Sequence, residues 1–426
     1  MIVNTDPRVR AATRATYLAF IGSGAVLASW AARIPQVRDG LGLSPSRLGL
    51  VLLAIAAGSI VSLILSGQLV TRFGSRRIVT AMAALMGVAI VIVAIGYRIG
   101  VLPVVVGLVF FGFANGAWDV AMNLQGTVVE RRLGRAIMPR FHAGYSVGTV
   151  GGALIGAAAV ALHVPVTAHL IAAALVVATI VILSVRGFVS DSSADPIPTP
   201  ASVDSPALAE AEPSGFRRAL ATWREPRTLL IGVFVLAFAF TEGVGIDWIS
   251  VAVIDDYRAS ATVGALAFAT FLSTMTLGRW FGPALLDRYG RVPVVRALAM
   301  VSLVGLALFV FGPNVPVAFA GALLWGTGAS LGFPVGMSAA ADDPAKAAAR
   351  VSVVASIAYC AFLGGPPLIG FLGDHFTVRN GLLAVAVLLG VAITLSGAIK
   401  PLSPERPVPE PDADEPPVSC ASRATP

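Results

Sequence analysis

The chain has 426 residues, of which 56% are hydrophobic and only 12% are charged, and its formal net charge is +7. A soluble domain usually carries about twice that charged fraction, and this chain has too little polar surface to cover its apolar segments in water. The composition therefore indicates an all-α polytopic membrane protein. The basic residues lie in short connections, where they orient a chain in a membrane, so the net charge does not indicate nucleic-acid binding.

The apolar residues fall in blocks of roughly 20, the length of a helix that crosses a bilayer core. The first block follows a polar start and has no small-residue cleavage site, so we interpret it as a retained span and not as a signal peptide. We predict twelve transmembrane helices, at about 14–34, 46–70, 78–97, 101–128, 140–162, 165–186, 228–252, 261–286, 292–311, 316–338, 351–372 and 379–399.

Arginines are unevenly distributed between the two sides that these spans define. The side that would hold both termini carries most of them, including Arg72, Arg76, Arg77, Arg131, Arg132, Arg135, Arg288 and Arg291. By the positive-inside rule, this side is cytoplasmic, and the chain is expected in the inner (plasma) membrane as a multi-pass protein with cytoplasmic N- and C-termini.

Composition also divides the chain into segments. Residues 189–226 are dominated by Pro, Ser, Ala and acids, which is typical of a flexible linker. We therefore predict an N-terminal six-helix bundle over 1–188, a cytoplasmic linker over 189–226, a C-terminal six-helix bundle over 227–400, and a disordered cytoplasmic tail over 401–426.

The two halves resemble each other at a nearly constant spacing. YSVGTVGGALIG at 145–156 matches YCAFLGGPPLIG at 359–370, so Tyr145 corresponds to Tyr359, and RFG at 72–74 matches RYG at 288–290. The repeat predicts two bundles of the same topology. Parallel repeats with a site between them at the membrane midplane are typical of transporters.

The connections after the second and eighth spans carry related motifs, Thr71-Arg-Phe-Gly-Ser-Arg-Arg77 and Asp287-Arg-Tyr-Gly-Arg291. They resemble the Gly-x-x-x-Asp-Arg-x-Gly-Arg-Arg pattern of the major facilitator superfamily, with Thr71 at the acidic position of the first copy and Pro283 at the first glycine position of the second. The resemblance implies tight turns whose charges gate neighbouring helix ends. Positive-inside charge alone is the simpler explanation of the arginines. The residues concerned are Arg72, Gly74, Arg76, Asp287, Arg288, Gly290 and Arg291.

The fourth span contains ANGAWDVAMN, in which Asn115, Asp119 and Asn123 are four residues apart and so share one helix face. An acid inside a membrane span indicates a functional site. Apolar surroundings favour the neutral form of a carboxylic acid, which allows it to exchange a proton near neutral pH. We expect Asp119 to couple transport to protons. A structural ion pair, for example with Arg33, is the alternative.

Other polar and aromatic residues inside the spans complete the predicted site. Glu242 is the second candidate for proton coupling. The expected substrate contacts are Arg33, Asn115, Trp118, Asn123, Tyr145, Asp247, Trp248 and Tyr359. The asparagines could equally form interhelical hydrogen bonds, and the tyrosines could simply pack. Glycines at 144, 148, 152 and 156 predict close helix packing.

The segment Gly116–Asn123 resembles the Gly-x-x-Glu-x-x-x-Asn of fucose permease-like sugar:proton symporters, and Arg33-Ile-Pro-Gln36 resembles the sequence after their first span. The acid of their first span falls on Ala31 here. The resemblance implies coupling through Asp119 alone or with Glu242, or else a solute that is not a sugar, such as an anion paired with Arg33.

We expect a monomeric transporter in the lipid bilayer that moves a small polar solute with protons by alternating access, with a sugar as the first candidate. The alternatives are proton-antiport export of drugs or metabolites and a non-transporting membrane sensor. The sequence shows no metal cluster, nucleophile arrangement or phosphate loop, so we expect neither an enzyme nor a cofactor.

Overall fold

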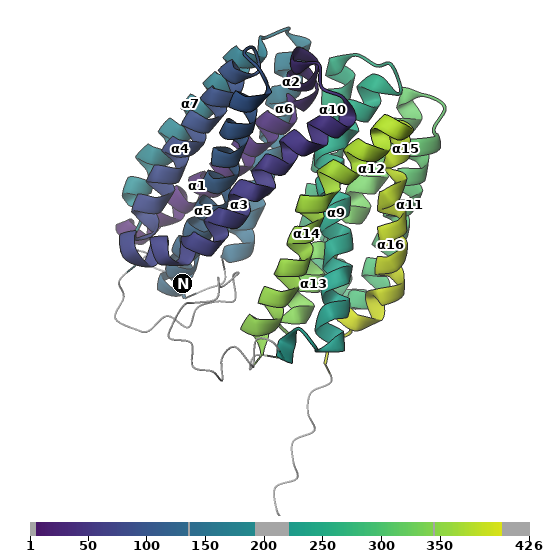
Figure 1. Cartoon of the computed structure of the whole chain (residues 1–426). Coiled ribbons are helices and arrows are strands. Elements are labelled where there is room, and N and C mark those ends of the chain that lie inside the picture. Colours follow the sequence, from purple (N-terminus) through teal and green to yellow (C-terminus); the bar gives the residue numbers. More distant parts are fainter. Residues whose placement is uncertain (1–5, 135–136, 192–220, 344–345, 403–426) are drawn as a thin grey trace, which may run out of the picture.

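The computed structural model describes residues 6–134, 137–191, 221–343 and 346–402. Within these ranges, twelve helical segments are long and apolar enough to cross a membrane, which confirms the predicted number. They form two bundles that lie side by side (Figure 1). Most of the predicted linker and tail, residues 192–220 and 403–426, lie outside the described residues, so those two assignments stay predictions.

The N-terminal bundle contains α1 (Pro7–Ala31), α2 (Ile34–Leu41), α3 (Pro45–Phe73), α4 (Ser75–Gly96), α5 (Val101–Leu133), α6 (Met138–Ala161), α7 (Val166–Ser184) and η1 (Val185–Gly187). The C-terminal bundle contains α9 (Pro226–Asp255), α10 (Ala261–Tyr289), α11 (Arg291–Phe311), α12 (Val315–Ala329), α13 (Gly332–Ala340), α14 (Ala347–His375), α15 (Val378–Gly381), α16 (Leu383–Leu395) and η2 (Ser396–Ile399).

Two predicted spans differ from the structure. The first starts at Pro7 and not at residue 14, because the Asp6 side chain accepts a hydrogen bond from the Arg8 amide and caps the helix. The same span then breaks before α2. The tenth span is also interrupted, between α12 and α13. Gly328 therefore lies in α12, whereas Gly332 and Gly336, which follow it at four-residue spacing, lie in α13.

The backbone confirms the parallel repeat most clearly in α3 and α10. Each has 29 residues and follows a serine, Ser44 or Ser260, whose side chain caps the first turn. Each ends at a glycine, Gly74 or Gly290, with φ of 81°. Residues other than glycine rarely adopt this conformation, so both tight turns depend on their glycines.

Helix pairing is also the same in the two bundles. In the first, α1 packs against α6 and α7, and α5 packs against α3 and α4. In the second, α9 packs against α14 and α16, and α12 packs against α10 and α11. The bundles meet through two related contacts, α3 with α14 and α6 with α10.

The glycines of α6 pack against α1, inside the first bundle. A Cβ added at Gly148 or Gly152 would collide with the backbone of Ile21 or Ala25. The predicted close packing is confirmed, and it joins α1 to α6 and not one bundle to the other.

We expect Gly148→Ala to lower the free energy of unfolding by about 1–3 kcal/mol, because overpacking forces two helix backbones apart. Gly151→Ala is the matched control, since a Cβ there meets nothing within 4 Å. Thermal unfolding of the purified protein in detergent measures both. Equal melting temperatures for the two variants would contradict the close contact.

The contacts between bundles concentrate at one end, which we call the closed end: residues 34–49, 255–265 and 366–379. There Ser46 donates its amide to Asp374 at 3.2 Å, and Ser44 donates its hydroxyl to the same carboxylate at 3.1 Å. A Cβ at Gly49 would collide with the Pro366 backbone. The bundles are therefore tightly apposed at this end.

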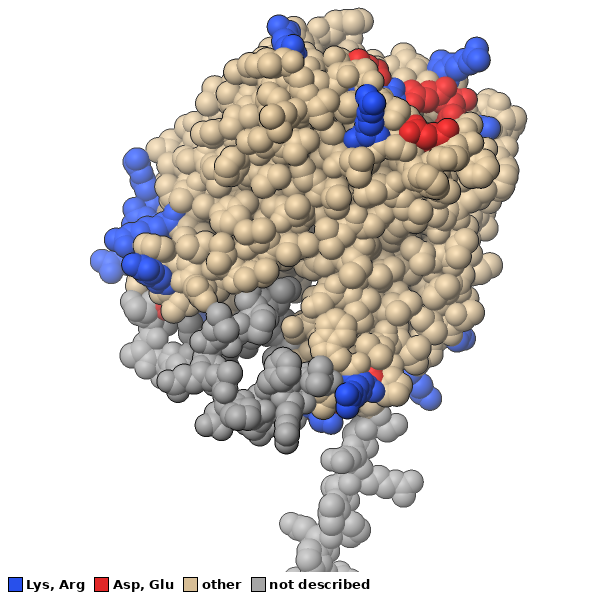
Figure 2. Space-filling model, viewed as in Figure 1, with Lys and Arg blue, Asp and Glu red and all other residues tan. Residues whose placement is uncertain are grey.

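The opposite end carries the turns at Gly74 and Gly290, and we call it the open end. Figure 1 shows the two bundles diverging toward it. Charged side chains gather near the two ends on the face seen in Figure 2, and a broad uncharged band separates them. Such a band is what a lipid-facing surface requires.

Candidate functional site

The predicted polar stripe of α5 forms one face, as expected. The Asn123 side-chain amide donates to the Asp119 backbone carbonyl at 2.9 Å and to the Asp119 carboxylate at 3.2 Å. Asp119 is exposed, whereas Asn123 is half-buried. Asn115 buries its side-chain oxygen without a hydrogen-bond partner among the described residues. No cation among the described residues pairs with Asp119.

Two tyrosines from opposite bundles lie close to this acid. The charge of Asp119 acts on the hydroxyls of both Tyr145 in α6 and Tyr359 in α14. The repeat predicted this pair, and the structure brings Tyr145 to a cavity between the bundles. Neither hydroxyl has a hydrogen-bond partner among the described residues, so both remain available to a solute.

Glu242 in α9 forms an ion pair with Arg279 in α10, with 2.7 Å between Oε2 and Nη2. Arg279 also donates its Nε to the Ser330 carbonyl at 3.2 Å. Ser330 lies in the break between α12 and α13, where carbonyls lack helical partners. The interruption of the tenth span therefore helps to hold Arg279 in place.

Sequence reasoning missed Arg279. Its signal was present, since an arginine inside an apolar span is as costly as an acid and marks a functional site by the same argument. The charge of Arg279 also acts on Tyr145 and on His142.

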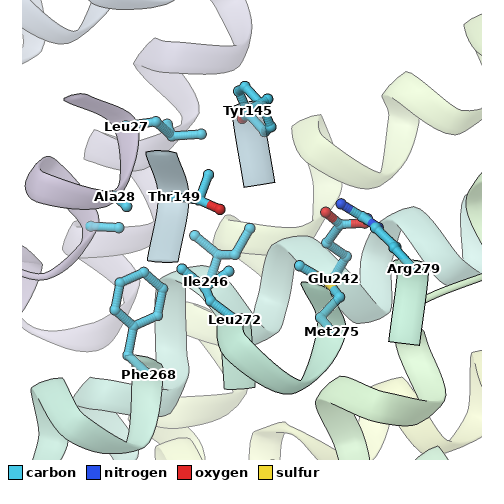
Figure 3. A pocket seen from close by; sticks show the side chains of 11 residues that line it. Leu27, Ala28, Tyr145, Thr149, Glu242, Ile246, Phe268, Leu272, Met275 and Arg279 are labelled. Atoms are coloured by element: carbon cyan, nitrogen blue, oxygen red, sulfur yellow. The ribbon is translucent and has the colours of Figure 1, made fainter. Parts of the chain in front are cut away.

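A cavity between the bundles is lined by Tyr145 and by the Glu242–Arg279 pair, whereas Asp119 and Tyr359 are not among its lining residues. Tyr145, Thr149, Glu242 and Arg279 line one part, and apolar side chains from α1, α9 and α10 line the rest. Figure 3 shows Glu242 and Arg279 meeting beside Met275, with Tyr145 and Thr149 projecting from α6. Ala31 also lines this cavity. This position, which the sequence comparison aligned with an acid of the sugar symporters, therefore faces the cavity and is apolar here.

Three predicted substrate contacts need correction. Arg33 is 2% exposed, and it donates to His169 Nδ1 and to the Val164 carbonyl, each at 3.0 Å. These bonds hold its guanidinium inside the N-terminal bundle, so it does not pair with Asp119. Trp118 and Trp248 are completely buried in the hydrophobic core, because each points away from the face that its acidic neighbour occupies.

Asp247 lies on α9, partly buried and outside the residues that line the cavity. Its carboxylate has no hydrogen bond or ion pair with a described residue. The structure does not bring it together with Glu242. No group of three metal-ligating side chains occurs in the described part of the chain.

The two predicted gating turns differ in their charge contacts. At the second turn, Arg291 pairs with Asp342 at 2.7 Å, and Arg227 pairs with the same carboxylate at 3.1 Å. At the first turn, Ser75 instead donates its amide and hydroxyl to Asp191. Arg72 and Arg288 each lie over the following aromatic ring, at 5.3 and 5.2 Å.

The remaining gating residues extend outward. Arg76, Asp287 and Gly290 are exposed, and Asp287 has no partner among the described residues. The ion pairs at the second turn thus join Arg291 and Arg227 to Asp342 and do not include Asp287, and the gating role of these residues stays a prediction.

A further ion pair at the open end predicts a pH effect. The hydrogen bond from Arg350, at 2.7 Å, lowers the pKa of Glu225 below its ordinary 4.5. A lowered folded-state pKa adds stability above pH 4.5, and this stability is lost as the pH falls through the folded-state pKa. We expect Glu225→Gln to cost roughly 0.2–1 kcal/mol at pH 7 and nothing at low pH.

Melting temperatures from pH 7 down to the acid limit of the folded protein measure this difference. Asp287→Asn, which removes an unpaired exposed carboxylate, is the control and should leave the profile unchanged. A pH-independent difference between wild type and Glu225→Gln would contradict the prediction.

Comparison with known proteins supports the fold. The family model of the Major Facilitator Superfamily matches residues 15–252 and 243–425. The chain is 30% identical over 378 residues to an uncharacterized MFS-type transporter of Yersinia pestis, covering 88% of this chain and 92% of that protein.

Solved transporters share the architecture. The structure of the nucleoside transporter NupG matches with a TM-score of 0.68 at 13% identity, covering 92% of this chain and 98% of that chain. The fucose:proton symporter of E. coli matches with a TM-score of 0.63 at 15% identity, covering 93% of this chain and 100% of that chain. Together with the two six-helix bundles, these matches show that the chain belongs to the major facilitator superfamily of membrane transporters.

Proposed function

We propose that this protein is a proton-coupled secondary transporter of a small solute, and that Asp119 carries the proton. The observation that supports this most directly is an acid inside a membrane-spanning helix with no cationic partner among the described residues. An uncompensated carboxylate in an apolar environment is costly. A proton or the charged group of a solute relieves that cost.

Glu242 has a different role in this proposal. Arg279 already balances its charge, so Glu242 gains little from a proton while the pair is intact. A solute that engages Arg279 or Glu242 would loosen the pair. The solute would therefore first separate Glu242 from Arg279, and Glu242 would bind a proton only after that separation.

Transport would proceed by alternating access of the two bundles. The closed end is sealed by contacts across the bundles, and the open end lies where arginines are concentrated. We infer from the positive-inside rule that the open end faces the cytoplasm of a cell whose inner membrane holds the protein. The structure then represents the inward-facing state.

The solute has two candidate classes. A sugar or nucleoside, moved together with protons, is suggested by the printed names of the fucose:proton symporter and the nucleoside transporter. Export of a metabolite or drug in exchange for protons is the second class, and the apolar Ala31 in place of an acid favours it. A membrane sensor that transports nothing is the least supported, since an ion pair inside a cavity and an unpaired acid inside a span serve no evident purpose there.

The experiment is proton flux in proteoliposomes that contain a pH-sensitive dye. Addition of a solute outside should acidify the lumen if solute and proton move together, and should make it alkaline if they exchange. A solute that binds the purified protein, raises its melting temperature, and yet moves neither itself nor protons would contradict the proposal and favour the sensor.

A further inference from the structure

The described residues that line the central cavity carry one positive and one negative charge. These charges belong to Glu242 and Arg279, while Tyr145 and Thr149 add hydroxyl groups from α6. The Thr149 hydroxyl already donates to the Ser146 carbonyl at 2.8 Å. The cavity has an empty volume of about 330 Å³, which is at the small end of ligand pockets. It therefore suits a small solute without net charge.

The ion pair uses only part of its hydrogen-bonding capacity. One Glu242 oxygen, Oε2, accepts from one Arg279 nitrogen, Nη2, at 2.7 Å, and Arg279 Nε donates to the Ser330 carbonyl. Glu242 Oε1 and Arg279 Nη1 form no hydrogen bond with a described residue. The two side chains are 19% and 28% exposed. The pair thus offers a solute one free acceptor and one free donor, each on a charged group.

The apolar part of the cavity adjoins both charged groups. Ile246 follows Glu242 by four residues in α9, and Met275 precedes Arg279 by four residues in α10. Residues four apart share a helix face, so each of these apolar side chains lies next to a charged one. All four line the cavity, and Figure 3 shows them together.

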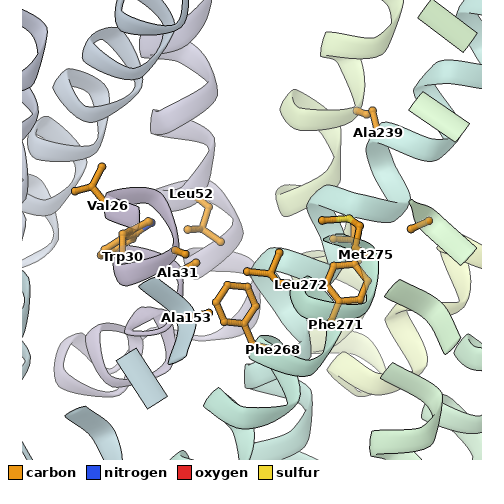
Figure 4. Packing of buried hydrophobic residues seen from close by; sticks show 14 of the residues in the cluster. Val26, Trp30, Ala31, Leu52, Ala153, Ala239, Phe268, Phe271, Leu272 and Met275 are labelled. Carbon is orange, nitrogen blue, oxygen red and sulfur yellow. The ribbon is translucent and has the colours of Figure 1, made fainter. Parts of the chain in front are cut away.

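Both bundles contribute to this apolar part. Figure 4 shows Ala31 of the N-terminal bundle beside Leu272 and Phe268 of the C-terminal bundle. An apolar group there is removed from water by both halves of the molecule, which favours its binding. Hydroxyl groups of a sugar would lose their hydrogen bonds to water there without replacing them. We call these side chains the apolar wall: Ala31, Ile246, Phe268, Leu272 and Met275.

We infer that the cavity binds a small zwitterion with an apolar side chain, of the kind found in aliphatic α-amino acids. Its carboxylate accepts from Arg279 Nη1, its ammonium group donates to Glu242 Oε1, and its side chain lies against the apolar wall. This rests on the proposed function, because it assumes that the central cavity is the transport site.

A zwitterion is selected by what each of its charges does to the ion pair. A solute carboxylate competes with Glu242 for Arg279 and, by itself, leaves Glu242 without a cation. A solute ammonium group competes with Arg279 for Glu242 and, by itself, leaves Arg279 without an anion. Loss of one partner from a poorly solvated ion pair is strongly unfavourable. A zwitterion supplies both replacements, so the pair loosens while each charge stays compensated.

The first test compares probes of matched size on the purified full-length protein at pH 7. L-Leucine is the zwitterion, isopentylamine is the same molecule without the carboxylate, and isocaproate is the same molecule without the ammonium group. Calorimetry and melting temperature report binding. We expect L-leucine to bind at least about tenfold more tightly than either analogue, because each analogue lacks one of the two charge-assisted contacts.

L-Asparagine and D-xylose test the apolar wall. L-Asparagine has the zwitterionic group of L-leucine and nearly the same shape, but its side chain is polar. We expect it to bind at least about tenfold more weakly than L-leucine, because its amide loses water without gaining hydrogen bonds. D-Xylose, which has neither the charges nor an apolar side chain, should not bind.

Glu242→Gln should invert the preference between two of these probes. Glutamine keeps the size of the side chain but leaves the positive charge of Arg279 uncompensated. Isocaproate should then bind more tightly than L-leucine, because the ammonium group of L-leucine has lost its partner and meets that charge. Asp287→Asn is the control, since it removes an exposed acid near the open end of α10, and it should keep the wild-type order.

Isopentylamine or isocaproate bound by the wild type as tightly as L-leucine would overturn the inference. Equal binding of L-asparagine, or no binding of L-leucine, would overturn it as well. The wild-type comparison does not depend on how well the variants fold. Solute-driven proton flux with another compound would leave the proposed function standing in those cases. Conversely, L-leucine that binds but moves neither itself nor protons would overturn the proposed transport and leave the binding site in place.

Discussion

Asp119→Asn should abolish solute-driven proton flux in proteoliposomes, down to the level of protein-free vesicles. Asparagine keeps the size of the side chain and can still bond to Asn123, which donates to Asp119 in the wild type. It cannot bind or release a proton in the physiological range. Glu242, the acid that lines the cavity, is already paired with Arg279, so it is not expected to replace Asp119.

Exchange of labelled solute across the same membrane is the second readout. Exchange needs the bundles to alternate with solute bound, but it needs no net proton movement, so it should continue in Asp119→Asn. Asp287→Asn is the control, because it removes an exposed acid at the open end, far from the cavity along α10. Proton flux that persists in Asp119→Asn would eliminate this residue as the coupling site.

Arg38→Ala should shift the protein toward a state that is open at the closed end. Arg38 in α2 forms a bidentate ion pair with Asp255 at the end of α9, with 2.8 Å between Nη2 and Oδ1. This pair joins the two bundles, and the Arg38 side chain is only 9% exposed. Loss of one partner leaves a poorly solvated carboxylate in the closed state alone.

The expected destabilisation of the closed end is about 1–3 kcal/mol, reduced from the fully buried case because Asp255 is partly exposed. Each 1.4 kcal/mol changes the ratio of two states about tenfold. We therefore expect the ratio of the outward-open to the inward-open state to increase about fivefold to 150-fold.

Spin labels at Leu102 and Phe376, which are 74% and 69% exposed at the closed end of each bundle, report the separation of the bundles. They require a background without Cys360 and Cys420. Asp39→Asn is the matched control: Asp39 also pairs with Arg38, at 2.6 Å, but it lies in the same bundle. An unchanged distance distribution in Arg38→Ala would show that the remaining contacts alone keep this end closed.

The neighbouring contacts make the control informative. The Ser44 and Ser46 bonds to Asp374 also cross the bundles, and they do not involve Arg38. They should hold the closed end in Asp39→Asn. In Arg38→Ala, the Ser44 and Ser46 bonds must hold the closed end without help from the Arg38–Asp255 ion pair.

The sequence by itself determined the features that rest on local physics. Twelve spans follow from hydropathy, because a helix that crosses a bilayer needs about 20 mostly apolar residues. The turns at Gly74 and Gly290 follow from glycine, because few other residues adopt their φ of 81°. The stripe of Asn115, Asp119 and Asn123 follows from helix geometry, since residues four apart share a face in any α-helix.

Only the tertiary structure decided which charges meet. Glu242 and Arg279 are 37 residues apart on different helices, and Arg33 finds His169 at a separation of 136 residues. A helix inside a membrane is apolar on every side, so its sequence carries little periodic contrast to show which face points inward. For this reason the sequence suggested Trp118 as a substrate contact, although it is buried in the hydrophobic core. Ala31 stood out in the sequence only as the replacement of an acid, whereas the structure shows that it lines the cavity.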